Sequence, residues 1–223
     1  FSISTITWGT AFRSDDKNFV NETFEQLLLN REVISMRLGM VNDDSFALED
    51  SAYWYGYGAT NQDVIIPAFV AAYTGQSADK VQLNPFKMIP LPNWDLTYDG
   101  LTRIALFKKW FRTVTVGHSY RSTFNISRFQ TNLEFVEGQN NTDAAGNFIP
   151  ERQMTVITIA EQLSPLINFD ATLNNSLIAK VELRRDRNLS LSLSNYQVTE
   201  VRGVEWIIGT GYRFQNVKFP FAI

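Results

Sequence analysis

The stretch NLSLSLSNYQ, residues 188–197, alternates leucine and serine almost without exception. Side chains on a β-strand point to opposite faces in turn, so this strand has one apolar face and one small polar face. The apolar face carries Leu189, Leu191 and Leu193, and the polar face carries Ser190, Ser192 and Ser194. A soluble sheet with a core on one side can have this pattern, and so can a membrane barrel with lipid outside and a wet lumen inside.

The composition favours the barrel. Charged residues make up 19% of the chain and aromatic residues 13%, yet the mean hydropathy is only -0.15. A low charge content with many aromatics and a moderate hydropathy is typical of strands that meet lipid on one face only. No apolar run approaches the roughly 20 residues of a membrane helix. Strands would therefore have to cross the membrane.

Charge, cysteine content and the start of the chain limit the function classes. The net charge of -3 argues against a nucleic-acid partner, which usually binds a basic patch. The absence of cysteine excludes disulfides, thiolate metal sites and cysteine nucleophiles. The sequence begins at Phe1 without the pattern of a signal peptide, so we expect a piece of a longer or processed chain.

The C-terminal third predicts a meander of strands. Apolar and polar residues alternate over 166–174, 177–185 and 204–215, besides the leucine–serine strand. We expect turns at Asn174-Asn175 and at residues 186–188, because Asn and Asp are common in tight turns. Four earlier segments also predict strands: residues 1–12, 96–107, 113–126 and 153–162, the last ending at Ser164-Pro165.

Strand parity then predicts which side chains face lipid and which face a lumen. Trp206 near one end of the last strand, with Tyr212 and Phe214 near the other, would form an aromatic girdle at the two interfaces. The full lipid or girdle set is Val114, Val116, Tyr120, Phe124, Leu189, Leu191, Leu193, Trp206, Ile208, Tyr212 and Phe214. The lumen set is Thr113, Thr115, Ser119, Arg121, Ser190, Ser192, Ser194 and Arg213.

Two segments interrupt this rhythm. Residues 13–94 predict a helix-containing insert, a cap or lumen element, with helical spacing up to Gly39 and again up to Gly75. Residues 137–150 predict a polar loop, and residues 95–223 otherwise form the wall strands. Because two strands separate the two insertions, both should lie on the same side of the sheet.

Two features of the insert could bind a partner. The aromatic run contains Tyr53, Trp54 and Tyr55, and could stack on a sugar or peptide. The second helix carries Ile66, Phe69 and Tyr73, and could dock a partner. The alternative that we favour in both cases is packing of the insert onto its own scaffold.

No residue pattern predicts an enzyme, a cofactor or a metal site. His118 is the only histidine, and its strand parity places it with Val116, so we expect a structural or interfacial role. Asp15-Asp16 and Asp43-Asp44 lack the further oxygen ligands of a calcium loop, so we expect solvated turns. Nucleophile-elbow, phosphate-loop and dinucleotide motifs do not occur in the sequence.

Four strings resemble a known family over most of the chain, from about residue 18 to residue 220. They are ATNQDVIIPAFVAAYTG (59–75), IPLPNWDLTYDGL (89–101), VTVGHSYRSTFNI (114–126) and RNLSLSLSNYQVTEVRGVEWIIGTGYRF (187–214). These strings resemble the C-terminal region of the SprA (Sov) family, the outer-membrane translocon of the Bacteroidota type IX secretion system. The strings are long and idiosyncratic, and they would form only a late piece of such a protein.

The resemblance implies an all-β fold, as a segment of a very large antiparallel transmembrane β-barrel that exports folded cargo. It also implies an integral outer-membrane location, partly exposed at the cell surface, and a role in gliding motility in gliding species. The implied partners are a PorV-like barrel, a periplasmic plug protein, outer-membrane lipid and cargo with type IX C-terminal domains. The family has no catalytic residues to carry over.

Two other function classes remain open from the residues alone. A barrel receptor or porin-like nutrient channel would use the aromatic insert as its ligand site, and a small-ligand uptake phenotype would distinguish it. An outer-membrane enzyme would need a lumen-facing His118 within a serine, histidine and acid constellation.

Overall fold

The computed structural model describes residues 1–13 and 21–214. Asp15-Asp16 lies outside the described residues. The strands are β1 (Ser2–Ser4), β2 (Trp94–Tyr98), β3 (Phe111–Thr131), β4 (Arg152–Leu173), β5 (Leu177–Ser192) and β6 (Gln197–Tyr212). The helices are α1 (Trp8–Ala11), α2 (Glu22–Gly39), α3 (Gln62–Thr74) and α4 (Ala105–Lys108), with 3-10 turns at Pro85–Lys87 and Gly100–Arg103.

The strands form one open, mostly antiparallel sheet. Its order is β1-β3-β4-β5-β6, and β2 also pairs with β3. Ser2 to Ser4 pair antiparallel with residues 123–125, and β2 pairs antiparallel with residues 116–120 of the same strand. The expected antiparallel meander is therefore confirmed, and in the described residues no strand lies beyond β6.

Two strands are longer than the sequence predicted. Residues 186–188 form no turn, because Arg187 stays in register with the leucine face and pairs with Glu161 of β4, so β5 runs unbroken. Similarly, β4 continues through Ser164-Pro165. Pro165 lacks a backbone N–H and cannot donate a hydrogen bond to the neighbouring strand. At the next residue, the carbonyl oxygen of Leu166 lies 2.7 Å from Nδ1 of His118 on β3.

Other predicted strands are shorter or shifted. The strand expected over residues 1–12 is confined to β1, because Trp8–Ala11 is helical. The strand expected over 96–107 ends at Tyr98, since Asp99-Gly100 opens a 3-10 turn that leads into α4. The last strand begins at Gln197 rather than residue 204, and Phe214 lies beyond its end.

The chain divides into two compact units, and each long strand contributes a segment to both. The first unit comprises Phe1–Pro92, Ser122–Ala160 and Asn188–Val201. The second comprises Asn93–Arg121, Glu161–Arg187 and, among the described residues, 202–214. No helix in the described part of the chain is both long and apolar enough to cross a membrane.

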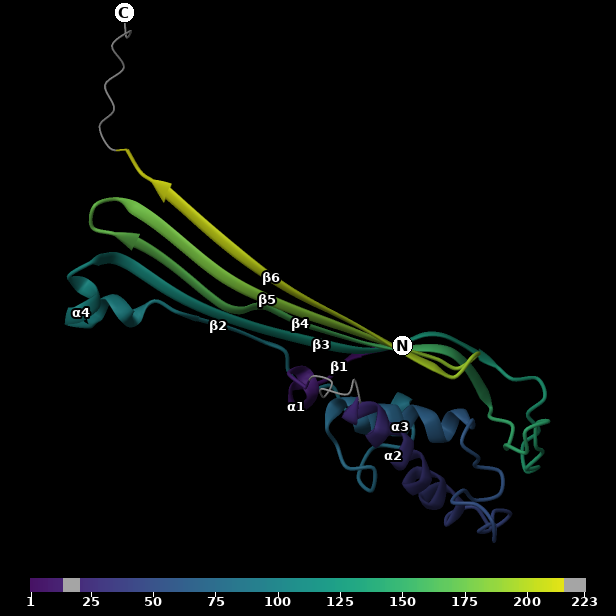
Figure 1. Cartoon of the computed structure of the whole chain (residues 1–223). Coiled ribbons are helices and arrows are strands. Elements are labelled where there is room, and N and C mark those ends of the chain that lie inside the picture. The colour runs from purple at the N-terminus through teal and green to yellow at the C-terminus, as the bar shows by residue number, and fades with distance from the viewer. Residues whose placement is uncertain (14–20, 215–223) are drawn as a thin grey trace, which may run out of the picture. The chain divides into compact units, whose positions relative to one another are not determined.

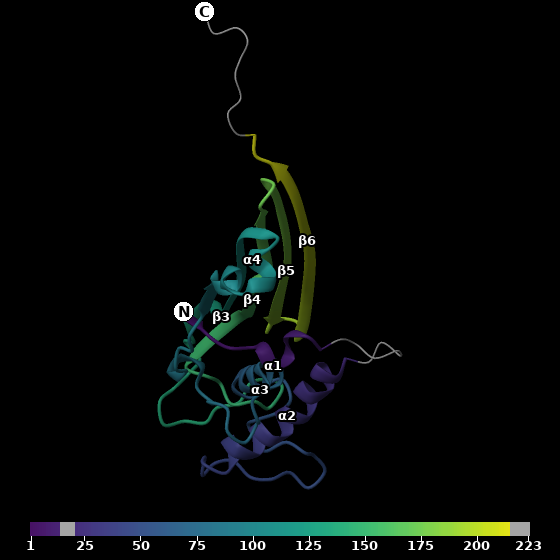
Figure 2. The same ribbon diagram turned by 90° about the vertical axis from the view of Figure 1, so that its left-hand side faces the viewer.

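The two helices of the insert end at or next to the predicted glycines, Gly39 and Gly75. The Asn21 side chain accepts a hydrogen bond from the Phe24 amide at the start of α2, and Asn61 caps α3 in the same way through Asp63. Gly75 ends α3 in the left-handed conformation, with a φ of 74°. In the first unit α2 and α3 lie side by side (Figure 1), and α1 contacts α3 (Figure 2).

The core of the first unit lies between α3 and the leucine face of β5. Every residue of α3 from Val64 to Thr74 is buried, as expected for a helix that is apolar all round. The core contains Phe69, Phe124 and the three leucines of the alternating stretch, and Leu191 is only 1% exposed. The prediction that Phe124, Leu189, Leu191 and Leu193 face lipid is therefore wrong, because the insert covers them.

Candidate functional site: a two-faced sheet

The strand segments of the second unit form a sheet whose two faces differ sharply. These segments are residues 111–121, 161–173, 177–187 and 202–212, about eleven residues each. Close approaches at glycines fix which residues share a face. A Cβ on Gly117 would lie 3.6 Å from that of Asn168 on β4, and one on Gly209 would lie 3.6 Å from that of Lys180 on β5.

One face is mainly polar, although Ile178 also lies on it and is 40% exposed. It carries the predicted lumen residues Thr113, Thr115, Ser119 and Arg121 of β3, followed by Asn168 and Asp170, then Lys180, Glu182 and Arg184, then Glu205. Glu182 is the centre of a charged ladder. Its carboxylate lies 2.8 Å from Nζ of Lys180 and 2.5 Å from Nε of Arg184. Nη1 of Arg184 lies 3.6 Å from the Glu205 carboxylate.

A polar hollow opens on this face. It has a volume of about 250 Å³ and is lined by Asp95, Ser119, Arg121, Gln162 and Ser164. Ser119 is buried at this hollow, and its hydroxyl donates a hydrogen bond to the Trp94 carbonyl at 3.5 Å. Of the β3 residues predicted to face a lumen, Ser119 and Arg121 line this hollow, and their contact with a lumen stays a prediction.

The opposite face exposes large apolar side chains. Trp206 is 63% exposed and Ile208 77% exposed, and both belong to the predicted lipid set. Leu96, Ile167 and Val181 of the neighbouring strands are exposed as well. Tyr212 and Phe214 are exposed and lie 5.0 Å apart, ring to ring. A row of this kind is unusual on a water-exposed sheet and marks a surface that another apolar phase or partner covers.

Two residues predicted to face lipid are instead buried on this face. Tyr120 is 0% exposed because the Trp94 ring stacks on it, with centroids 4.4 Å apart. Val114 is also buried. It lies near the start of β3, next to Val116, which pairs with Tyr98 at the end of β2, and residues 99–110 connect these two strands. The lipid assignment is therefore wrong for Tyr120 and Val114, whereas Val116 is half-buried.

A buried ion pair between β4 and β5 lies on the same face. Nε of Arg187 lies 3.1 Å from the Glu161 carboxylate, and both side chains are only 2% exposed. The Tyr120 hydroxyl donates to the other Glu161 oxygen at 3.0 Å. The three residues connect β3, β4 and β5, and they fix the register of those strands. The sequence signal that could have located this pair is the parity of Arg187, which matches the leucine face.

The remaining lumen predictions fall on the polar parity or near the ends of strands. Ser190 and Ser192 of β5 lie opposite in parity to the buried leucines and are half-buried. Ser194 lies in the turn before β6, and its hydroxyl is 3.0 Å from that of Ser192. Arg213 follows β6 and is exposed, with its backbone N–H bonded to the Ser176 carbonyl at 3.0 Å. Their contact with a lumen stays a prediction.

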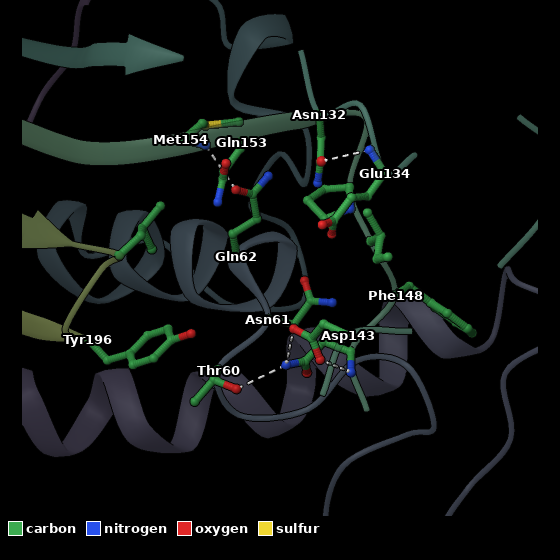
Figure 3. A pocket seen from close by; sticks show the side chains of 14 residues that line it. Thr60, Asn61, Gln62, Asn132, Glu134, Asp143, Phe148, Gln153, Met154 and Tyr196 are labelled. Carbon is green, nitrogen blue, oxygen red and sulfur yellow. Dashed lines mark hydrogen bonds between the residues drawn. The ribbon is translucent and has the colours of Figure 1, made fainter. Parts of the chain in front are cut away.

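A second candidate is a pocket where the insert meets the 132–151 loop in the first unit (Figure 3). Its volume is about 180 Å³. The Gln62 amide bridges the backbone of two residues of β4, donating to the Arg152 carbonyl and accepting from the Met154 N–H at 3.1 Å. Asn147 donates to the Thr60 hydroxyl at 3.0 Å. These amides connect the insert to the loop and to β4, so the pocket has a structural role. The two insertions contact each other in the first unit.

An adjacent cavity of about 350 Å³ contains a titratable pair. Tyr57 and Asp63 line it together with Phe86 and Arg152, whose guanidinium lies 5.2 Å from the Phe86 ring centre. Burial raises the pKa of the Asp63 carboxyl above its ordinary value of 3.8, despite the hydrogen bond from Gln62. Burial also raises the pKa of Tyr57.

The aromatic run and the second helix pack onto their own scaffold, which is the alternative that the sequence favoured. Tyr55 stacks on Phe46 at 4.9 Å, and the Trp54 ring occupies the space above Gly39. Tyr53 is half-buried. On α3, the residues proposed for partner docking are all buried in the core, namely Ile66, Phe69 and Tyr73. They are therefore not available to a partner.

Metal-ligating residues do not gather anywhere in residues 1–13 and 21–214, where no group of three or more His, Cys, Asp or Glu side chains could hold a metal ion. His118 contacts Leu166 through Nδ1 and lies 6.3 Å from the Trp94 ring, on the same face as Val116. Asp43-Asp44 lies in a turn, where Asp44 accepts a hydrogen bond from Asn140 at 2.5 Å.

Comparison with known proteins adds no assignment. Neither a scan against protein-family models nor a search of curated proteins found a match to this chain. The two-faced sheet of the second unit is therefore the feature from which a function has to be argued.

Proposed function

We propose that the chain is a wall segment of an outer-membrane β-barrel that exports proteins. The observation that carries this proposal is the apolar row on the second unit, in which Trp206 and Ile208 of β6 are 63% and 77% exposed. The four strand segments beneath it have about the length that a tilted strand needs to cross a hydrocarbon core, roughly 9–11 residues. Polar and charged side chains occupy their other face, as on the lumen side of a barrel.

The first unit supports this proposal by contrast. There, the same alternation of apolar and polar residues is present, but the leucines are buried in one core with α3. In the second unit Val114, Tyr120 and Leu163 are buried, but Ile167, Val181, Trp206 and Ile208 stay exposed. Lipid would cover this surface in a membrane. Together with Leu96, the exposed residues lie on four different strands, which favours a continuous apolar phase over a single small ligand.

The export activity and the partners rest on the resemblance to the SprA family. The four matching strings include the leucine–serine stretch and the whole of β6. On this proposal, the polar face lines the path of folded type IX cargo, and a PorV-like barrel and a plug protein bind elsewhere on the complete translocon. Gliding motility would depend on it in gliding species.

A nutrient receptor or porin-like channel is the second candidate. The polar hollow around Ser119 and Arg121 favours it, because its volume of about 250 Å³ suits a small polar solute. Deleting the gene separates the two. Loss of secreted proteins from the cell surface and medium supports export, whereas normal secretion with defective uptake of a small solute supports the receptor.

Cysteine labelling tests the wall assignment, because the chain has no cysteine of its own. Three single variants would be made: Ile208→Cys on the apolar face, Glu205→Cys on the polar face, and Leu191→Cys in the protein core as the matched control. Each would be treated in isolated outer membranes with a charged maleimide and with a lipid-soluble one.

We expect the charged reagent to label Glu205→Cys and only the lipid-soluble reagent to label Ile208→Cys. Leu191→Cys should resist both reagents, because α3 covers it. If Ile208→Cys reacts with the charged reagent as readily as Glu205→Cys does, the apolar row faces water or a removable partner, and the barrel proposal is wrong.

A further inference from the structure

The segment that joins β2 to β3 concentrates positive charge next to exposed apolar side chains. Residues 100–112, GLTRIALFKKWFR, contain four cations and no Asp or Glu, in a chain whose net charge is -3. We call this segment the basic turn. Arg103, Lys108, Lys109 and Arg112 are all exposed, and none of them forms an ion pair within the described part of the chain.

Large apolar side chains alternate with these cations. Leu106 is 70% exposed, and Ile104 and Trp110 are exposed as well. Nζ of Lys109 lies 5.6 Å from the Trp110 ring centre. Side chains of both kinds on one short segment suit a membrane interface, where the apolar groups enter the acyl boundary and the cations meet lipid phosphates.

The basic turn is held in place against the sheet. The Asn174 side chain donates to the Lys109 carbonyl at 3.0 Å, and its backbone N–H donates to the Trp110 carbonyl at 3.1 Å. Phe107 packs on Phe111 within the segment, with centroids 6.1 Å apart, and the Phe111 ring lies 6.4 Å from that of Phe169 on β4. Within the second unit, α4 lies at the same end of the sheet as the hairpin between β4 and β5 (Figure 1). The exposed groups are therefore preorganised.

The same end of the sheet carries further residues of the same two kinds. The backbone N–H of Arg213 donates to the Ser176 carbonyl in the β4–β5 hairpin at 3.0 Å. Tyr212 and Phe214, on either side of Arg213, are exposed aromatics. Aromatic and basic residues thus gather at one end of these strands, which is where barrels place their interfacial girdles.

We propose that the basic turn is an interfacial anchor that binds the phosphate groups of anionic lipids and inserts Leu106 and Trp110 into the acyl boundary. This proposal rests on the proposed function in taking a lipid bilayer as the partner. An acidic protein surface would satisfy the four cations, but it would leave Ile104, Leu106 and Trp110 without an apolar phase. The lipid therefore accounts for both kinds of side chain.

The test uses the full chain with Leu106→Cys, the only cysteine it would then contain, labelled with an environment-sensitive dye. Binding is measured with phosphatidylcholine vesicles that contain or lack phosphatidylglycerol, with and without excess polyglutamate as a soluble polyanion. The variant Lys108→Gln/Lys109→Gln is compared with Lys80→Gln/Lys87→Gln, which removes two exposed lysines from the first unit.

We expect tighter binding to the phosphatidylglycerol vesicles, with a blue shift of the dye. Removing Lys108 and Lys109 should weaken that binding by about fivefold for each cation, and the control pair should change it little. Two results would contradict the proposed lipid anchor. One is that both double variants bind the vesicles with equal affinity. The other is that polyglutamate abolishes binding and the dye shows no blue shift on the vesicles. The maleimide pattern at Glu205 and Ile208 decides the wall assignment separately.

Discussion

Breaking the buried ion pair one partner at a time should be far more damaging than replacing both partners together. Nε of Arg187 and the Glu161 carboxylate are 3.1 Å apart and 2% exposed, so neither charge can turn to water when the other is removed. Glu161→Leu and Arg187→Met should therefore each lower the free energy of unfolding by about 3–5 kcal/mol. The double variant should stay within about 1 kcal/mol of the parent or exceed it, because two apolar side chains of similar volume avoid the desolvation cost.

The third member of the cluster gives an intermediate value. Tyr120→Phe removes the 3.0 Å hydrogen bond from the Tyr120 hydroxyl to the charged Glu161 carboxylate, and should lower the free energy of unfolding by about 1.5–3 kcal/mol. Glu205→Gln is the matched control, because this carboxylate is 61% exposed and lies 3.6 Å from Arg184. An exposed pair of this kind should contribute less than about 1 kcal/mol.

Urea unfolding followed by tryptophan fluorescence gives these free energies for the full chain in detergent. The two single variants and the double variant complete a double-mutant cycle, whose coupling should be at least about 3 kcal/mol in favour of the pair. If the two single losses simply add in the double variant, Glu161 and Arg187 do not act as a buried pair, and the proposed fixing of strand register is wrong.

Three further predictions concern the first unit. Leu191→Ala should lower the free energy of unfolding by about 2–5 kcal/mol, whereas Ser192→Ala should change it by less than about 0.5 kcal/mol, as measured by urea unfolding. Burial raises the pKa of Asp63 in the folded state, so the stability that this carboxyl contributes is full below the ordinary value of 3.8 and is lost as the pH rises through the folded-state pKa. Asp63→Asn should therefore reduce the fall in stability between these two pH values. Gly56→Ala should lower the melting temperature, because Gly56 has a φ of 79° and a Cβ there would overlap the Phe148 ring; an unchanged melting temperature would contradict that close contact.

Local signals predicted the two long helices, α2 and α3, and most of the strands. Asn caps and terminal glycines act over a few residues, so the limits of α2 and α3 could be read from Gly39 and Gly75. Alternation likewise identified the strands. It could not show that residues 186–188 continue a strand, because Asp-Arg-Asn suits a turn equally well and only the distant Glu161 makes Arg187 part of β5.

The environment of each face could not be predicted from alternation alone. Leu191 and Ile208 have the same apolar character and the same period, yet the first is covered by α3 and the second is exposed. What distinguishes them is a helix more than a hundred residues away in sequence. The basic turn was missed for a related reason, since residues 96–107 alternate well enough to suggest a strand.

The position of β6 at the end of the sheet has a consequence for how such a chain enters a membrane. Along residues 204–212, the backbone amides and carbonyls on the side away from β5 meet no strand within residues 1–13 and 21–214. In hydrocarbon each unsatisfied group would cost several kcal/mol. On the proposed function, β6 therefore has to acquire its next neighbour before or during insertion, so it acts as a template that makes membrane entry conditional on continued synthesis or assembly of the wall.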